Sequence, residues 1–288
     1  MSLLRKNKAA GYAVLSGPLI FVLALLVVPY LIMFSYSFYL KTYPTFQPDF
    51  QFGNYALLFT DPQYYQVFLR TFLIAVKVTL LSLLFAFPIT YYLVFVIKSS
   101  RLRSLLYLAL ILPLWVSYLL RGYIWKIILG NDGILNSLLM YLGVIDEPSQ
   151  VFLYNQTSMI VTFVYILIPF MAMPIYAVLE KIPRNLIEAS EDLGYPAWQT
   201  FLQVTLPLSI SGIVAGCTMT FCLTFGDFIT PILVGGTDGT MVANVVTTQF
   251  GAALNWPLGA AISVAMLVVV LIVLNIGDRL EKRGMVKG

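Results

Sequence analysis

Long apolar stretches without a single charged residue constrain this chain more than any other feature. Residues 12–34, 78–97 and 258–276 each lack Asp, Glu, Lys and Arg. A helix needs about 20 apolar residues to cross the roughly 30 Å hydrocarbon core of a bilayer, so each stretch can form one transmembrane helix. Only 10% of the 288 residues are charged, against about 25% in soluble domains. The sequence therefore predicts an integral membrane protein.

The hydropathy pattern predicts an all-α, polytopic protein with about six transmembrane helices in a single domain, residues 1–288. We expect the first span to be retained, because it is longer than the apolar part of a signal peptide and no convincing cleavage site follows it. Gly212 and Gly216 form a Gly-xxx-Gly pair that permits close helix packing, within this chain or between subunits. The expected spans are residues 11–35, 70–97, 104–129, 158–179, 208–232 and 257–277.

The distribution of basic residues predicts the orientation of these spans. Between the spans, one side of the membrane receives Arg5, Lys6, Lys8, Lys98, Arg101, Arg103, Lys181, Arg184, Arg279, Lys282, Arg283 and Lys287. The other side receives only Lys41, Arg70 and Lys126. Because Lys and Arg accumulate in cytoplasmic segments of membrane proteins, we expect both termini in the cytoplasm.

Residue types exclude several kinds of chemistry. The chain has no histidine, so a His-based metal site and a Ser-His-Asp triad each lack a necessary residue. Cys217 and Cys222 lie five positions apart in one apolar run and are interpreted as small apolar residues of a membrane helix. We find no G-x-x-x-x-G-K-[ST] phosphate-binding loop. The sequence predicts no metal site, no catalytic residues and no nucleic-acid partner.

The loop at residues 181–209 is patterned like two short helices and not like a slack linker. Pro183 is suited to a helix start and Gly194 to a helix end. Pro196 can open a second helix, and Pro207 then marks the start of the fifth span. We therefore expect an ordered cytoplasmic element between the fourth and fifth spans.

Three acidic residues give the first of these short helices a polar face. Glu188, Glu191 and Asp192 stand at i, i+3 and i+4, so they share one side of the helix. The helix can dock a soluble partner or lie flat on the membrane. The acids disfavour contact with an anionic inner leaflet, so we favour docking.

This loop resembles the EAA loop of ABC-importer permeases, in which Glu-Ala-Ala is followed by Gly and then by Ile-x-Leu-Pro. Here Ser190 replaces the second alanine and Val204 the isoleucine, while Leu206 and Pro207 match. The resemblance implies a coupling loop, residues 181–207, that contacts an ATP-binding subunit. The residues expected to make or shape this contact are Glu188, Ala189, Ser190, Asp192, Leu193 and Gly194.

A wider part of the chain is similar to the permeases of spermidine/putrescine importers. The similar stretches are residues 112–129, 143–146, 164–182, 225–236 and 255–261. The resemblance implies a type I importer permease in the bacterial inner membrane, transporting polyamines. Related branches of the family carry opines, phosphonates and other small solutes, so another solute stays open. A channel or secondary carrier that works without ATP is the alternative from another class, although it would need no coupling loop.

The same resemblance implies the partners and the source of energy. Such a permease pairs with a homologous second permease, identical or distinct, and with two ATP-binding subunits. A periplasmic or extracellular solute-binding protein delivers the solute. ATP and Mg²⁺ are expected on the partner ATPase, so this chain is expected to bind no cofactor and to be a transport subunit without enzymatic activity.

Charged and aromatic residues in the expected spans are the candidates for the solute pathway. Asp227 is an acid inside the fifth expected span, and a buried carboxylate is costly unless it has a function or a partner. It is expected to meet a solute ammonium group or to pair with Lys77 or Arg121. For these two basic residues we favour structural ion pairs over an anionic solute. The aromatic residues beside Arg121 form an interfacial belt or line the pathway. The pathway candidates are Asp227, Trp115, Tyr118 and Arg121.

Overall fold

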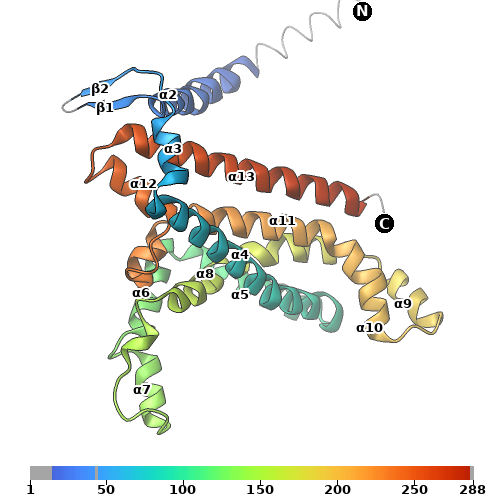
Figure 1. Ribbon diagram of the computed structural model, residues 1–288. Helices are drawn as coiled ribbons and strands as arrows, with labels where there is room; N and C mark the ends of the chain where they lie inside the picture. Colours follow the sequence, from blue (N-terminus) through green and yellow to red (C-terminus); the bar gives the residue numbers. More distant parts are fainter. Residues whose placement is uncertain (1–14, 43–44, 286–288) are drawn as a thin grey trace, which may run out of the picture. The chain divides into compact units, whose positions relative to one another are not determined.

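The computed structural model describes residues 15–42 and 45–285, and almost all of its regular structure is helical (Figure 1). Arg5, Lys6, Lys8 and Lys287, which support the predicted orientation, lie outside the described residues. The helices are α2 (Val28–Tyr36), α3 (Gly53–Thr60), α4 (Pro62–Tyr91), α5 (Ser100–Ile111), α6 (Tyr118–Leu129), α7 (Ile134–Tyr141), α8 (Gln156–Leu179), α9 (Arg184–Asp192), α10 (Ala197–Thr200), α11 (Leu206–Phe225), α12 (Val242–Phe250) and α13 (Trp256–Met285). The strands are β1 (Leu40–Thr42) and β2 (Thr45–Gln47).

Among the described residues, five helical stretches are long and apolar enough to cross a membrane, and a bent pair brings the number up to six. The prediction of about six spans is thereby confirmed. Short π-helical segments extend several of the helices, for example residues Tyr92–Val96 after α4. The long stretches are Leu15–Tyr36, Pro62–Val96, Gln156–Leu179, Ala197–Phe225 and Trp256–Lys282.

The third expected span, residues 104–129, falls in the bent pair and is not one straight helix. The helical stretches Ser100–Trp115 and Tyr118–Tyr141 meet at an angle of 94°. Pro113 has no backbone N–H to donate, and the helix tightens into a 3-10 turn over Leu112–Trp115. Val116 and Ser117 then take extended ψ angles of 136°, which ends one helix and starts another.

The fifth span also ends earlier than predicted. α11 stops at Phe225, with Gly226 as its C-cap, whereas the sequence predicts a helix to residue 232. Helical structure resumes as a π-helical segment, Pro231–Gly235. Asp227 therefore lies in a break between two helical segments, and the expectation that it belongs to the helix itself is wrong.

The chain divides into two compact units, of which the smaller comprises residues 1–62 and 246–266. In its described part, β1 and β2 pair as an antiparallel hairpin. The Phe38 ring is buried and stacks on Phe50 with centroids 4.7 Å apart. The Nζ of Lys41 donates a hydrogen bond of 2.8 Å to the carbonyl of Ala253. The Lys41 hydrogen bond holds the hairpin to the segment before α13.

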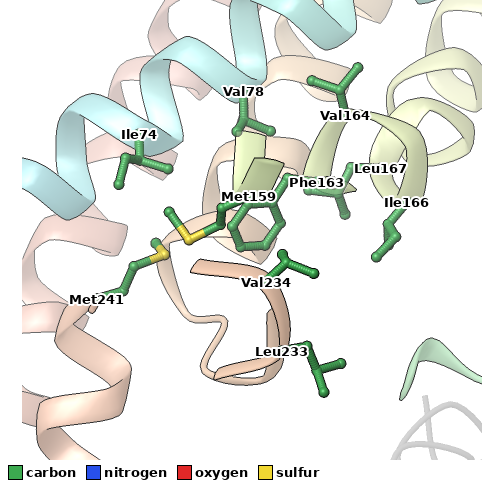
Figure 2. Packing of buried hydrophobic residues seen from close by; sticks show 10 residues of the cluster. All are labelled: Ile74, Val78, Met159, Phe163, Val164, Ile166, Leu167, Leu233, Val234 and Met241. Carbon is green, nitrogen blue, oxygen red and sulfur yellow. The ribbon is translucent and has the colours of Figure 1, made fainter. Parts of the chain in front are cut away.

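The larger unit comprises residues 63–245 and 267–288 and contains the main buried cores. In the first core, Met159 and Phe163 of α8 lie among residues from α4 and from the Pro231–Gly235 segment (Figure 2). A second core joins the end of α4 to the end of α8 and includes Ile182, just before α9. The single-domain prediction for residues 1–288 stays a prediction.

Two glycines set the packing of α11 against α8, which lie side by side in the larger unit (Figure 1). A Cβ atom on Gly212 would lie 2.8 Å from the carbonyl oxygen of Pro174, and one on Gly216 would lie 2.8 Å from that of Met171. Both are closer than a real Cβ atom approaches. The Gly-xxx-Gly pair therefore serves packing within this chain, which is one of the two alternatives left open by the sequence.

Candidate functional site

The segment predicted to couple to an ATPase begins with a firm attachment to the transmembrane helices. Pro183 is the N-cap of α9, as the sequence predicts. The preceding Ile182 is buried in the second core. A guanidinium nitrogen of Arg184 donates a hydrogen bond of 3.4 Å to the carbonyl of Val94, near the end of the second span. The first turn of α9 is therefore tied to the second span.

The end of α9 is formed by a Schellman turn around Gly194. Gly194 has a φ of +84°, which glycine adopts without the penalty that a Cβ imposes. Its N–H bonds to the carbonyl of Glu191 at 2.8 Å, and the N–H of Tyr195 bonds to that of Ser190 at 3.2 Å. This pair of bonds is the hydrogen-bond pattern of the Schellman motif. Pro196 then caps α10, so both predicted helix boundaries are confirmed.

The short helix α9 has one side turned inward and another turned outward. Ser190 is buried, and its hydroxyl lies 3.0 Å from that of Thr200 in α10. This hydroxyl pair joins the two short helices, a role that alanine at position 190 would not fill. The outward-facing predicted residues are Glu188, Ala189, Asp192 and Leu193. Leu193 is 78% exposed and Trp198 is 62% exposed, so both acidic and apolar groups are accessible on this pair of short helices.

A second group of predicted residues meets at the break after α11. One carboxylate oxygen of Asp227, Oδ1, accepts hydrogen bonds from the backbone N–H groups of Ile229 (2.7 Å) and Thr230 (2.9 Å). This is the geometry by which an acidic side chain caps the start of a helix. The other oxygen, Oδ2, accepts a hydrogen bond from the hydroxyl of Tyr118. The structure therefore brings two of the four pathway candidates into direct contact.

Asp227 and Tyr118 line a cavity of about 220 Å³. Leu223 and Gly226 end α11 at its wall, and Phe170 of α8 closes another side. Phe228 is 44% exposed, so the cavity opens beside an aromatic ring. The residues that line the cavity are Tyr118, Leu167, Phe170, Leu223, Gly226, Asp227, Phe228 and Ile229. The Asp227 carboxylate is thus the charged group of an otherwise apolar and aromatic cavity.

Arg121 lies one turn after Tyr118 but does not line this cavity. Its side chain is buried, and one guanidinium nitrogen donates a hydrogen bond of 3.1 Å to the carbonyl of Ile166. The guanidinium carbon is 5.5 Å from the centroid of the Tyr118 ring. Arg121 therefore braces α6 against α8.

The structure separates the remaining candidates from this cavity. Trp115 is 85% exposed and sits in the 3-10 turn before the break. Lys77 is exposed on α4. Within the described part of the chain, neither Lys77 nor Arg121 forms an ion pair, so the expected pairing with Asp227 is wrong for this chain alone.

Sequence reasoning missed several residues that shape the two sites. Thr230 bonds to Asp227 and Tyr118, and Thr200 bonds to Ser190. A local signal was available for the first: Asp227 is followed by Thr230 and Pro231, and an acid shortly before proline is typical of a helix start. No local signal marks Thr200, because its partner lies on another helix.

These features define a class of membrane protein. The helical stretches contain two breaks, and a carboxylate lies at one of them. Discontinuous membrane helices are common at the solute sites of transporters. An ordered pair of short helices projects between the fourth and fifth spans and presents acidic and apolar groups. The fold and these sites are those of the membrane-embedded subunit of a solute transporter.

Comparisons with known proteins give the family. Residues 14–284 match the family described as "Binding-protein-dependent transport system inner membrane component". The chain is 38% identical over 227 residues to the spermidine/putrescine transport system permease protein PotB of Salmonella typhimurium (strain SL1344), covering 79% of this chain and 78% of that protein. It is 37% identical over 245 residues to the inner membrane ABC transporter permease protein YdcU of Escherichia coli (strain K12), covering 81% and 77%.

A solved bacterial ABC transporter that imports the acidic polysaccharide alginate shows the same fold, with a TM-score of 0.74, 19% identity, and coverage of 98% of this chain and 99% of that one. The present chain belongs to the family of binding-protein-dependent transport system inner-membrane components, the ABC-importer permeases. It is a multi-pass inner-membrane protein with the type I permease fold.

Proposed function

We propose that this permease forms the membrane pathway for polyamines such as spermidine and putrescine. The cavity beside Asp227 carries this proposal. Its one charged group is a carboxylate, and its walls are aromatic and apolar. A protonated amine bonds strongly to a carboxylate, and aromatic faces attract cations by about 0.5–2 kcal/mol. The name of the Salmonella relative, a spermidine/putrescine permease, supports the same solute class.

Uptake of radiolabelled spermidine and putrescine tests this function in cells that lack the gene and other polyamine importers. Wild-type protein should restore uptake. Asp227→Asn should reduce it at least tenfold, because the amide keeps a capping oxygen for the backbone but loses the charge that attracts an ammonium group. The matched control is Asp146→Asn, at an exposed acid outside the cavity. If the wild-type protein restores uptake of neither spermidine nor putrescine, the polyamine assignment is refuted.

We infer that α9 and α10 dock the ATP-binding subunits and transmit the movement that ATP drives. Glu188, Ala189, Asp192 and Leu193 supply the exposed surface, while Ser190 and Gly194 maintain its shape. A long apolar side chain such as Leu193, 78% exposed in a cytoplasmic segment, is suited to burial in a protein groove. ATP and Mg²⁺ bind to the partner subunits, and this chain supplies the pathway.

The complete importer in this proposal contains this chain, a homologous second permease, two ATP-binding subunits and a solute-binding protein outside the membrane. The exposed Lys77 supports the second permease. It lies within the apolar span Pro62–Val96, and a charged side chain within a span usually faces protein or water and not lipid. With both termini in the cytoplasm, the coupling loop is on the side where ATP is available.

A further inference from the structure

Two breaks in the transmembrane helices meet at one hydrogen-bonded contact. The break in the third span lies just before Tyr118, the first residue of α6. The break after α11 contains Asp227. The hydroxyl of Tyr118 donates to Oδ2 of Asp227 and lies 3.0 Å from the hydroxyl of Thr230. A single pair of side chains therefore connects two points at which helices can change direction.

The two oxygens of the Asp227 carboxylate have different hydrogen-bond partners. Oδ1 is committed to the backbone N–H groups of Ile229 and Thr230. Oδ2 is the oxygen left for an incoming donor, since its partners here are side-chain hydroxyls: that of Tyr118, and that of Thr230 at 3.5 Å. An ammonium group that binds Asp227 must therefore compete with Tyr118 for the same oxygen.

We propose that Tyr118 is a gating residue whose hydroxyl holds Oδ2 of Asp227 while the pathway is empty and is displaced by the primary ammonium group of the solute. The proposal rests on the proposed polyamine function and adds the residue that the solute must displace. Displacement replaces a hydroxyl donor with a charged donor, which bonds a carboxylate more strongly. Arrival of the solute then disconnects the two helix breaks.

The size of the cavity limits what reaches this carboxylate. Ligand pockets for whole small molecules are about 300–1,000 Å³, and this cavity is about 220 Å³. It therefore accommodates one ammonium end of an amine and a few methylene groups. Arg121 bonds to the Ile166 carbonyl and lies against the Tyr118 ring, so a second positive charge is disfavoured near that ring. One end of the polyamine enters first.

Equilibrium binding of radiolabelled spermidine to the purified membrane complex, without the solute-binding protein, tests the competition. Tyr118→Phe keeps the ring but removes the donor, so it should tighten binding about three- to tenfold, the range for losing one competing hydrogen bond. It should also raise ATP hydrolysis in the absence of solute at least twofold. Tyr123→Phe, on the same helix and outside the cavity lining, should change neither value.

Two further variants separate gating from simple structural damage. Asp227→Ser retains a capping hydroxyl but no longer reaches Tyr118, and it should abolish binding with or without Tyr118→Phe. Thr230→Val, which removes the other hydroxyl beside Tyr118 at nearly unchanged volume, should tighten binding in the same direction as Tyr118→Phe. Unchanged or weaker binding in Tyr118→Phe, with uptake still dependent on Asp227, would overturn the gate and leave the polyamine function intact. If cells that carry the wild-type protein take up neither amine, the polyamine function itself is rejected.

Discussion

Gly194 shows how one residue shapes the surface that we propose for coupling. Its φ of +84° places it in the left-handed region, and a Cβ atom there would meet no neighbour within 4 Å. A substitution therefore acts through backbone conformation and not through a clash. Because the Schellman turn sets the direction in which the chain leaves α9, the position of Leu193 and the start of α10 depend on this one conformation.

Gly194→Ala should weaken the association with the ATP-binding subunits by up to about five- to thirtyfold. Alanine in the left-handed region costs about 1–2 kcal/mol, and that energy opposes the docked shape of the turn. Gly194→Asn is the matched variant, because asparagine tolerates a positive φ, and it should retain most of the association. Co-purification of the ATPase from detergent measures both. Equal losses in the two variants would show that backbone conformation is not the cause.

At the scale of elements, the contact between α8 and α11 joins the segment that we propose for coupling to the break beside Asp227. α11 follows α10 through the π-helical segment Phe201–Thr205 and ends beside Asp227. α8 ends just before α9. Under the coupling proposal, a movement of the short helices would reach the break through two helices that are packed closely at Gly212 and Gly216. Lipid tails are as apolar as the side chains, so the hydrophobic effect does not drive helices together in a membrane. Their packing depends instead on close van der Waals contact.

Gly216→Leu should separate these helices and lower the thermal stability of the complex by several degrees, with loss of uptake. The reason is steric, since a Cβ atom alone would lie 2.8 Å from both the carbonyl oxygen and the sulfur of Met171. Ala215→Leu, the neighbouring position on α11, is half-exposed and should change stability much less. Scanning fluorimetry in detergent measures the shift. Similar stability of the two variants would contradict the close packing.

At the scale of the whole molecule, the exposed face of α4 is the surface that we propose for the second permease. Lys77 shares this face with the exposed residues Leu73, Leu80 and Leu84, at helical spacing. A leucine side chain is stable against lipid. Inserting an ammonium group near the middle of a span costs about 2.5–3.5 kcal/mol of free energy on insertion scales. A second permease or a water-filled pathway removes that cost.

Lys77→Leu distinguishes these surroundings. If a partner carboxylate or water meets the ammonium group, the variant should lose at least half of the uptake activity or of the associated second permease. If lipid covers this face, Lys77→Leu should be neutral or stabilising, and that result would exclude the assignment. Lys98→Leu, an exposed lysine just after the Pro62–Val96 span, is the control. Uptake and co-purification of the second permease are the measurements.

Local sequence determined the class of this protein, the number of its spans and the limits of its short helices. Hydropathy is a sum over neighbouring residues, so the apolar runs are visible without a structure. The same holds for Pro183, Gly194 and Pro196, because capping and positive φ are properties of a few consecutive residues. The orientation of the termini rests on charge alone and stays a prediction.

Only the tertiary structure decided how sharply the third span bends, where the fifth span breaks and what the breaks bring together. Hydropathy continues smoothly through Val116 and past Phe225, since apolar residues occur on both sides of each break. Tyr118 and Asp227 stand 109 positions apart, and no local pattern records a contact over that separation. Their pairing arises because α8 and its neighbours pack into one unit that carries both breaks, and packing is a property of the folded chain.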